Sequence, residues 1–224
     1  MTHLETELDK LKGDITGMFI LVQKQLNKSI QSLLTMDKDL AREIIAAEKR
    51  VNAEELKIDR VCENIVALFN PVAVDLRFVF ASFKINSHLE RMGDNAKGIA
   101  RYVLEMSEKF DADLIAKLQL QEMFSVANKM IDENIAAFEN GDSSKARLVF
   151  EMDERVDAIN FAANNIVADY IKANTDKAIH LLNLMSIIRK LERVGDLQAN
   201  IAEEIIFYVD AEVLKHDKNF HNKI

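Results

Sequence analysis

The sequence predicts an all-α protein made of two tandem three-helix units. Apolar residues recur every three or four positions along nearly the whole chain, which is the spacing of one helix face. The composition agrees, because the 224 residues are 49% apolar and 29% charged and include one proline and six glycines. In addition, the stretch LERMGDNAKGIA at 89–100 has a near copy, LERVGDLQANIA, at 191–202. The two copies indicate an internal repeat.

Three helices are expected in the first unit. An apolar stripe runs through residues 4–33, and the polar run TMDKD ends it. The second helix covers about residues 40–69. Asn70 and Pro71 then predict a helix cap followed by proline at the first helical position, so we expect the third helix to start there. This helix should end among the polar and acidic residues at 107–113.

The second unit repeats this plan. With a shift of 105 residues, Val51 falls on Val156 without any gap, so the fourth and fifth helices copy the first and second. The shift becomes 102 where Glu90 falls on Glu192, since the preceding loop is shorter by three residues. The sixth helix is expected to begin at 174–176, where asparagine or threonine can cap and aspartate suits a helix N-terminus.

The repeat divides the chain into residues 1–109 and 110–224. Domains of about 100 to 150 residues are the commonest size, so the chain can bury one large core or two small ones. No Ser/Pro-rich linker separates the two units, and any boundary between them must be tight.

Charge and apolar runs exclude several classes of protein. The net charge is −8 and the acidic excess is spread along the chain, which argues against broad binding to nucleic acid or anionic lipid. The start MTHLETELDKLK lacks the features of a signal peptide, and runs such as IVALF are far shorter than the roughly 20 residues that span a bilayer. Cys62, the one cysteine, is expected to be a buried thiol. We therefore expect a soluble, cytoplasmic protein.

Acidic side chains recur at four-residue spacing in both copies of the motif. Residues four apart share a helix face, so each copy places a glutamate and an aspartate together. The preceding helix of each unit should lie alongside and adds a partner pair. The eight positions are Glu48, Asn52, Glu90 and Asp94 in the first unit and Asp153, Asp157, Glu192 and Asp196 in the second.

These stripes carry a cost that calls for an explanation. Like charges at i and i+4 cost roughly 0.2 to 0.5 kcal/mol, and a mid-helix glycine, as at Gly93 and Gly195, costs about 1 kcal/mol. One interpretation is a solvated acidic face on which glycine lets two helices approach. The other is a pair of metal centres, since oxygens from adjacent helices suit Mg²⁺, Mn²⁺, iron or Zn²⁺. Repetition at matched positions favours metal.

The two stripes are not identical. In the first unit the stripe continues through Glu55 and Asp59, whereas the matching residues of the second unit are Asn160 and Asn164. If both units bind metal, the two sites should differ in affinity or in the number of ions they hold.

The sequence gives little support to an enzyme. Di-iron carboxylate bundles use a Glu-x-x-His pair, and no histidine of this chain has a glutamate three residues before it. His88 lies two residues before Glu90 and is interpreted as a packing or surface residue. The chain also lacks G-x-S-x-G, C-x-x-C and G-x-x-x-x-G-K motifs. We therefore predict no catalytic residue.

Several motifs together resemble the PhoU family of phosphate-specific transport accessory proteins. These are the N-terminal THLETELDKL, DKDLAR at 37–42, the helix EKRVNAEELKIDRVC, the link NPVAVDLR, and the paired LERMGD and LERVGD. The resemblance spans essentially the whole chain. It implies two three-helix bundles related by a pseudo-twofold axis, and a protein that is usually a homodimer.

The resemblance also implies a regulatory function. Members of this family are negative regulators of the phosphate-starvation response, thought to connect the ATPase subunit of the phosphate ABC transporter to a membrane-bound sensor histidine kinase. Several carry metal clusters at E/D-x-x-x-D motifs. By position these correspond to Glu90, Asp94, Glu192 and Asp196, with Glu48, Asn52, Asp153 and Asp157 from the neighbouring helices. Asp75 and Arg77 lie in the family's D-L-R element and are assigned a partner-contact or packing role.

The chain departs from the family pattern in one place, because the second unit has ANTDKAIH where the first has P-x-x-x-D-L-R. The C-terminal run HDKNFHNKI is polar and is expected to be frayed. Two alternatives to a regulatory adaptor between transporter and kinase remain open. One is a metal-dependent enzyme that uses the carboxylate clusters, and the other is a metal-storage bundle.

Overall fold

The computed structural model describes residues 2–214, which form helices and no strand. The long helices are α1 (His3–Thr35), α2 (Lys38–Phe69), α3 (Ala73–Glu105), α5 (Leu120–Asn140), α6 (Ser143–Ala173) and α7 (Ala178–Asp210). A short helix α4 (Ala112–Lys117) follows α3, and a 3₁₀ turn (Thr175–Lys177) precedes α7. The all-α prediction and the six long helices are confirmed.

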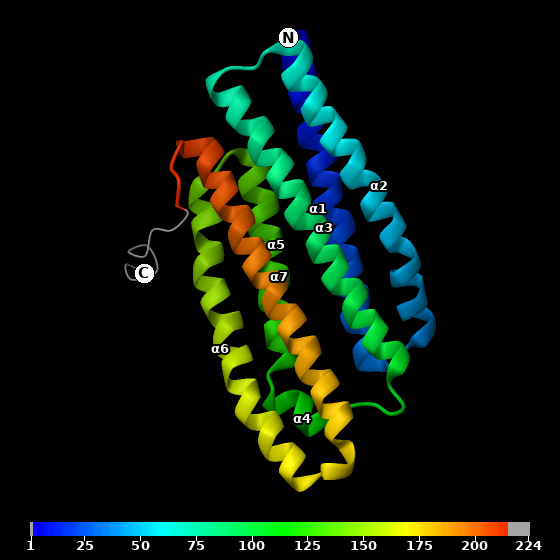
Figure 1. Cartoon of the computed structure of the whole chain (residues 1–224). Helices are drawn as coiled ribbons and strands as arrows, with labels where there is room; N and C mark the ends of the chain where they lie inside the picture. The colour runs from blue at the N-terminus through cyan, green and yellow to red at the C-terminus, as the bar shows by residue number, and fades with distance from the viewer. Residues whose placement is uncertain (1, 215–224) are drawn as a thin grey trace.

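The two units lie side by side with their long helices roughly parallel (Figure 1). Helices α1, α2 and α3 form one antiparallel bundle, and α5, α6 and α7 form the other. Helices α3 and α7 form the main contact between the units, and α1 also touches α5, while α2 and α6 are the outer helices. The contacts between the units therefore pair equivalent helices of the repeat, which is the expected pseudo-twofold arrangement.

A single hydrophobic core joins the two units. Phe138 of α5 is fully buried and packs against Phe19 and Phe78 of the first unit, with ring centroids 6.1 Å and 5.7 Å away. The hydroxyl of Tyr208 on α7 donates a hydrogen bond of 3.0 Å to the carbonyl of Phe138. The boundary between residues 109 and 110 stays a prediction, because the core does not divide there.

Polar side chains begin the helices as their sequence suggests. Thr2 and Glu5 form a reciprocal capping box at the start of α1, with backbone-to-side-chain distances of 2.7 and 3.2 Å. Asp37 caps α2 by accepting from the backbone of Leu40 at 2.9 Å. Asp142, its counterpart in the repeat, caps α6 by accepting a bond from the backbone of the second residue after it.

Two predicted helix starts were wrong by a few residues. Asn70 takes the left-handed conformation (φ 47°, ψ 55°) that ends α2, so it does not begin α3, whose first residue is Ala73. Pro71 is buried in the link. Asn174 donates its amide back to the carbonyl of Tyr170 at 3.1 Å and thereby ends α6. In both cases the asparagine ends the preceding helix.

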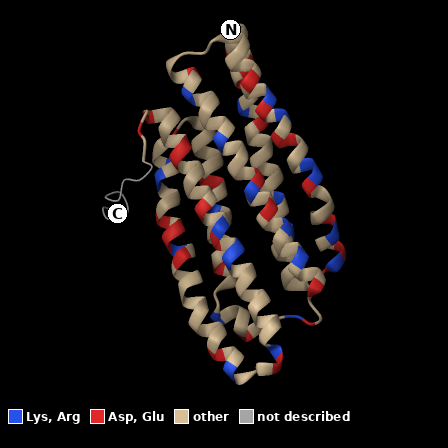
Figure 2. Ribbon diagram, in the orientation of Figure 1, with Lys and Arg blue, Asp and Glu red and all other residues tan. Residues whose placement is uncertain are grey.

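None of the described helices is long and apolar enough to cross a membrane. In the view of Figure 2, acidic and basic residues are interspersed along the helices and do not separate into an acidic and a basic face. The run HDKNFHNKI lies outside the described residues.

Candidate metal centres on two helix pairs

The structure places the predicted site residues on two pairs of adjacent helices. We define cluster 1, between α2 and α3, as Glu48, Asn52, Glu55, Glu90 and Asp94. Cluster 2, between α6 and α7, is the four predicted residues of the second unit: Asp153, Asp157, Glu192 and Asp196. Both helix pairs are in extensive contact, so carboxylates far apart in the sequence converge.

Cluster 2 has the geometry of a cation site. Asp157, Glu192 and Asp196 each offer a carboxylate oxygen, and these three oxygens lie within 4.8 Å of one another. Oxygens bound to one cation at about 2.0 to 2.6 Å are separated by up to about 5 Å, so this spacing suits a shared ion. Burial, and then the nearby charge of Asp196, raise the pKa of both Asp157 and Glu192.

Asp153 lies inward of these three carboxylates. Its Oδ1 is buried and has no hydrogen-bond partner among the described residues. Burial, and then the charges of Asp157, Asp196 and Glu192, raise the pKa of Asp153 to about 7. A buried carboxylate without a partner is costly, and a cation would compensate its charge. The donor set and this orphaned oxygen therefore fit a hard divalent cation.

Gly195 makes room for that inward carboxylate. A Cβ atom at this position would lie 2.6 Å from Oδ1 of Asp153 and 3.2 Å from Cγ1 of Val156. The mid-helix glycine is thus explained by close approach of α6 and by the space that the Asp153 carboxylate occupies. At the equivalent Gly93, a Cβ would lie 3.2 Å from Cγ1 of Val51.

Cluster 1 already contains a cationic side chain. The ammonium of Lys97 lies 2.6 Å from Glu48 and 3.5 Å from Asp94, and Asn52 donates to Glu48 at 3.1 Å. The hydrogen bond from Lys97 lowers the pKa of Glu48. Lys97 was not among the predicted site residues, although it lies one helix turn after Asp94. Its counterpart in the repeat is the neutral Ala199.

The other acidic groups of cluster 1 differ in their surroundings. Burial, followed by the charges of Asp94, Glu55 and Glu48, raises the pKa of Glu90 to about 7. Asp59, in contrast, accepts a hydrogen bond of 2.9 Å from the buried amide of Asn86. Glu55, Glu90 and Asp94 are the acidic groups that remain for an ion in cluster 1. Among the described residues, however, it is Asp157, Glu192 and Asp196 of cluster 2 that bring three carboxylate oxygens within 4.8 Å of one another.

The D-L-R element is separate from both clusters. Asp75 and Arg77 are half-buried in the first two turns of α3. The Nε atom of Arg77 is buried without a hydrogen-bond partner among the described residues. The partner-contact or packing role of these two residues stays a prediction.

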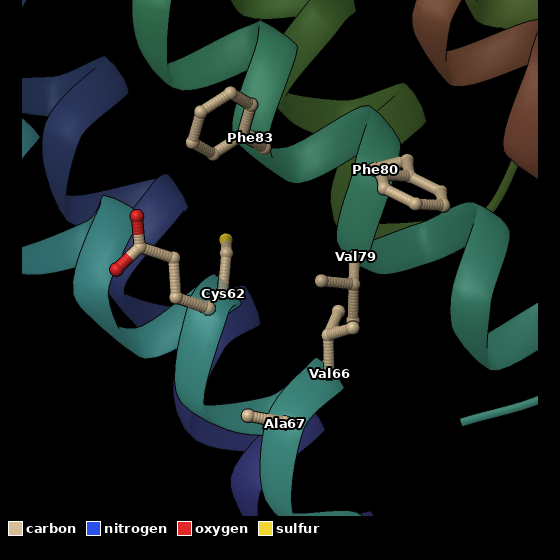
Figure 3. Close-up of a pocket in the computed structure, with 7 residues that line it drawn as sticks. Cys62, Val66, Ala67, Val79, Phe80 and Phe83 are labelled. Carbon is tan, nitrogen blue, oxygen red and sulfur yellow. The ribbon is translucent and has the colours of Figure 1, made fainter. Parts of the chain in front are cut away.

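An open apolar groove of about 380 Å³ lies between α2 and α3, beyond cluster 1 (Figure 3). Val66 and Val79 lie opposite each other in it, and Phe80 and Phe83 are 50% and 42% exposed at its α3 side. Cys62 lines the groove and is itself buried, which agrees with the predicted buried thiol. Burial raises the pKa of this thiol to about 12, so it is neutral at physiological pH.

Comparison with known proteins agrees with the repeat. Residues 15–103 and 120–205 each match the family model described as the PhoU domain. The phosphate-specific transport system accessory protein PhoU homolog 1 of Thermotoga maritima is 32% identical over 206 residues, covering 92% of this chain and 88% of that protein. PhoU of Escherichia coli, also named a phosphate-specific transport system accessory protein, is 30% identical over 96% of this chain and 88% of its own length.

Solved structures give the same result. The crystal structure of PhoU from Pseudomonas aeruginosa has a TM-score of 0.88 and 29% identity, and the match covers 94% of this chain and all of that one. The phosphate transport system regulatory protein PhoU from Streptococcus pneumoniae has a TM-score of 0.85 and 29% identity, covering 95% of this chain and all of that one. With both repeats matched and relatives aligned along nearly its whole length, the chain belongs to the PhoU family.

Proposed function

We propose that this protein is a cytoplasmic regulatory adaptor of phosphate uptake that keeps the phosphate-starvation response off when phosphate is plentiful. It links the ATPase subunit of a phosphate ABC transporter to a sensor histidine kinase, acts as a homodimer, and meets the membrane only through these partners. The observation that carries the proposal is the match along nearly the whole chain to proteins named as accessory proteins of phosphate-specific transport systems.

The second part of the proposal is that the acidic clusters bind divalent or transition metal ions. Mg²⁺, Mn²⁺, iron and Zn²⁺ all accept such oxygen donors. In cluster 2, Asp157, Glu192 and Asp196 would hold the ion, and Asp153 would supply the buried charge beneath it. The bound ion would join α6 to α7 and neutralise a group of like charges, which stabilises the face that these helices present.

The adaptor function is tested by crosslinked affinity purification of the tagged protein from phosphate-replete and phosphate-starved cells. Recovery of the transporter ATPase or the sensor kinase in a phosphate-dependent way is the expected result. Recovery of neither partner in both media would contradict the adaptor. A D157N/D196N double variant tests whether cation binding supports docking, with the exposed D169N as a matched control.

A second candidate, a metal-dependent hydrolase, is favoured by one observation. Glu90 and Asp153 have pKa values raised to about 7, which is where a general base is most effective. This candidate predicts Mn²⁺-dependent or iron-dependent turnover that is lost in an E90Q/D94N variant or in D153N. A metal-storage bundle, in turn, predicts that loss of the protein leaves phosphate-dependent gene expression unchanged.

A further inference from the structure

Gln25 is a buried polar residue in the core-facing stripe of α1. Only 3% of its surface is exposed, and neither Oε1 nor Nε2 has a hydrogen-bond partner among the described residues. Burying an amide without a partner destabilises a folded protein, and most buried amides are bonded. Its counterpart in the repeat, 105 residues later, is the buried apolar Met130. The polar side chain is therefore not required by the packing of the repeat.

The amide of Gln25 lies beneath cluster 1. A Cβ atom added at Gly93 would lie 3.3 Å from Oε1 of Gln25 and 3.2 Å from Cγ1 of Val51. Gly93 immediately precedes Asp94 and is one helix turn from Glu90, and Val51 immediately precedes Asn52. The amide oxygen thus lies, from α1, at the point where Gly93 of α3 packs against Val51 of α2, next in the sequence to two members of the cluster.

The same place in the second unit is occupied by a carboxylate. There the atom closest to a Cβ built at the glycine is Oδ1 of Asp153, which is also buried and without a partner. In the first unit the counterpart of Asp153 is Glu48, which instead reaches Lys97 at 2.6 Å. Each glycine therefore lies close to one buried oxygen that has no hydrogen-bond partner among the described residues. Helix α1 supplies this oxygen in the first unit, and α6 supplies it in the second.

We propose that Gln25 is an oxygen ligand of the first metal centre, in the position that Asp153 takes in the second. Amide oxygens bind hard divalent cations as backbone and side-chain carbonyls do in other proteins. A neutral oxygen in place of a carboxylate, in a cluster that also contains the ammonium of Lys97, makes the first centre the weaker of the two. This inference rests on the metal half of the proposed function and adds a third helix, α1, to the centre.

The test isolates the first centre in a D157N/D196N background, from which the second centre has been removed. Mn²⁺ binding is followed by electron paramagnetic resonance, and thermal unfolding is measured with EDTA and with Mn²⁺. Q25M, which copies Met130, should weaken Mn²⁺ binding about tenfold while leaving the EDTA-treated protein as stable or more stable. Q25E, which restores a carboxylate, should tighten Mn²⁺ binding about tenfold and lower the stability of the EDTA-treated protein.

A merely structural role would change stability without changing affinity. The matched control is N134L, which removes another buried amide, one that donates to the carbonyl of Gln198 at 3.0 Å. It should lower stability and leave Mn²⁺ binding at the first centre unaltered. Unchanged affinity in both Q25M and Q25E would overturn the inference and leave the amide bonded to water only. Absence of Mn²⁺ binding in the background protein also overturns it, whereas absence in the wild type overturns the metal half of the proposed function.

Discussion

The ammonium of Lys97 on α3 lies 2.6 Å from a carboxylate oxygen of Glu48 on α2, and in the repeat its place is taken by Ala199. A positive charge is thus built into the first cluster and not into the second. Both side chains are largely buried, with 17% and 15% of their surfaces exposed, so the pair is less screened than a surface ion pair. This contact is one difference between the two clusters.

Replacing Lys97 by methionine should strengthen cation binding at cluster 1, because the competing ammonium is removed. The cation-free protein should lose about 1 kcal/mol, since Glu48 and Asp94 lose their counter-charge. Mn²⁺ titration and urea unfolding of K97M measure both effects. K28M, which breaks an exposed ion pair with Glu43, is the control and should change neither quantity appreciably. Unaltered Mn²⁺ affinity in K97M would show that Lys97 does not compete with the ion.

Asp153 should make the cation-free protein less stable as the pH rises. Its folded pKa is about 7 against an ordinary value of 3.8, so between about pH 4 and pH 7 the folded chain holds a proton that the unfolded chain has released. The free energy of unfolding should fall through this range, by at most about 4 kcal/mol from Asp153, and level off above it. Glu90 acts in the same direction.

Urea unfolding in EDTA at several pH values measures this slope. D153N should flatten it, and Mn²⁺ should flatten it in the wild type, because a bound cation favours the ionised carboxylate. A slope that survives in D153N unchanged would show that Asp153 is not its source.

Gly195 to alanine should fail to give the usual gain in helix stability. Alanine is better than glycine in a helix by about 1 kcal/mol, but the new methyl group would displace the Asp153 carboxylate and press on Val156. We expect G195A to be at least about 1 kcal/mol less stable than G17A, whose Cβ meets nothing within 4 Å, and to bind Mn²⁺ more weakly. Equal stabilisation by the two alanines in urea unfolding would refute this account of Gly195.

Phe138 to alanine should destabilise both units together. The side chain is fully buried and contacts aromatic rings of the first unit as well as Tyr208 of its own. A loss of about 3 to 5 kcal/mol is expected in a single calorimetric transition. Two separated transitions, with the first unit melting at its original temperature, would show that the units fold independently. Y208F, which removes only the hydrogen bond to the Phe138 carbonyl, should cost about 1 kcal/mol.

The long helices and the duplicated plan were predictable because both produce a regular spacing of residues along the sequence. Helical periodicity marks the buried faces, and the paired motifs align the two units. Helix starts were less predictable, since Asn70 and Asn174 can serve either neighbouring helix. The short helix α4 was missed for a related reason: the polar residues at 107–113 were interpreted only as the end of α3, although Asp111 caps the new helix.

The candidate site was predictable only in part. Carboxylates at four-residue spacing identify the faces, but the spacing does not say which ammonium reaches them or what lies beneath. Lys97 contacts Glu48 across two helices, and Oε1 of Gln25 on α1 lies close to Gly93 of α3. Gln25 in particular lies within an apolar stripe of α1 that the sequence assigns to the core. Interactions across helices require the three-dimensional arrangement.

The central pairing of α3 with α7 has a thermodynamic consequence. Each of these helices contributes to one acidic cluster and also forms the main contact between the units. If an ion changes the spacing of α2 and α3, the change acts directly on α7, and the affinities of the two centres become linked. Such linkage is reciprocal: a partner protein that binds one helix pair and favours its ion-filled form must itself bind more tightly when the ion is present.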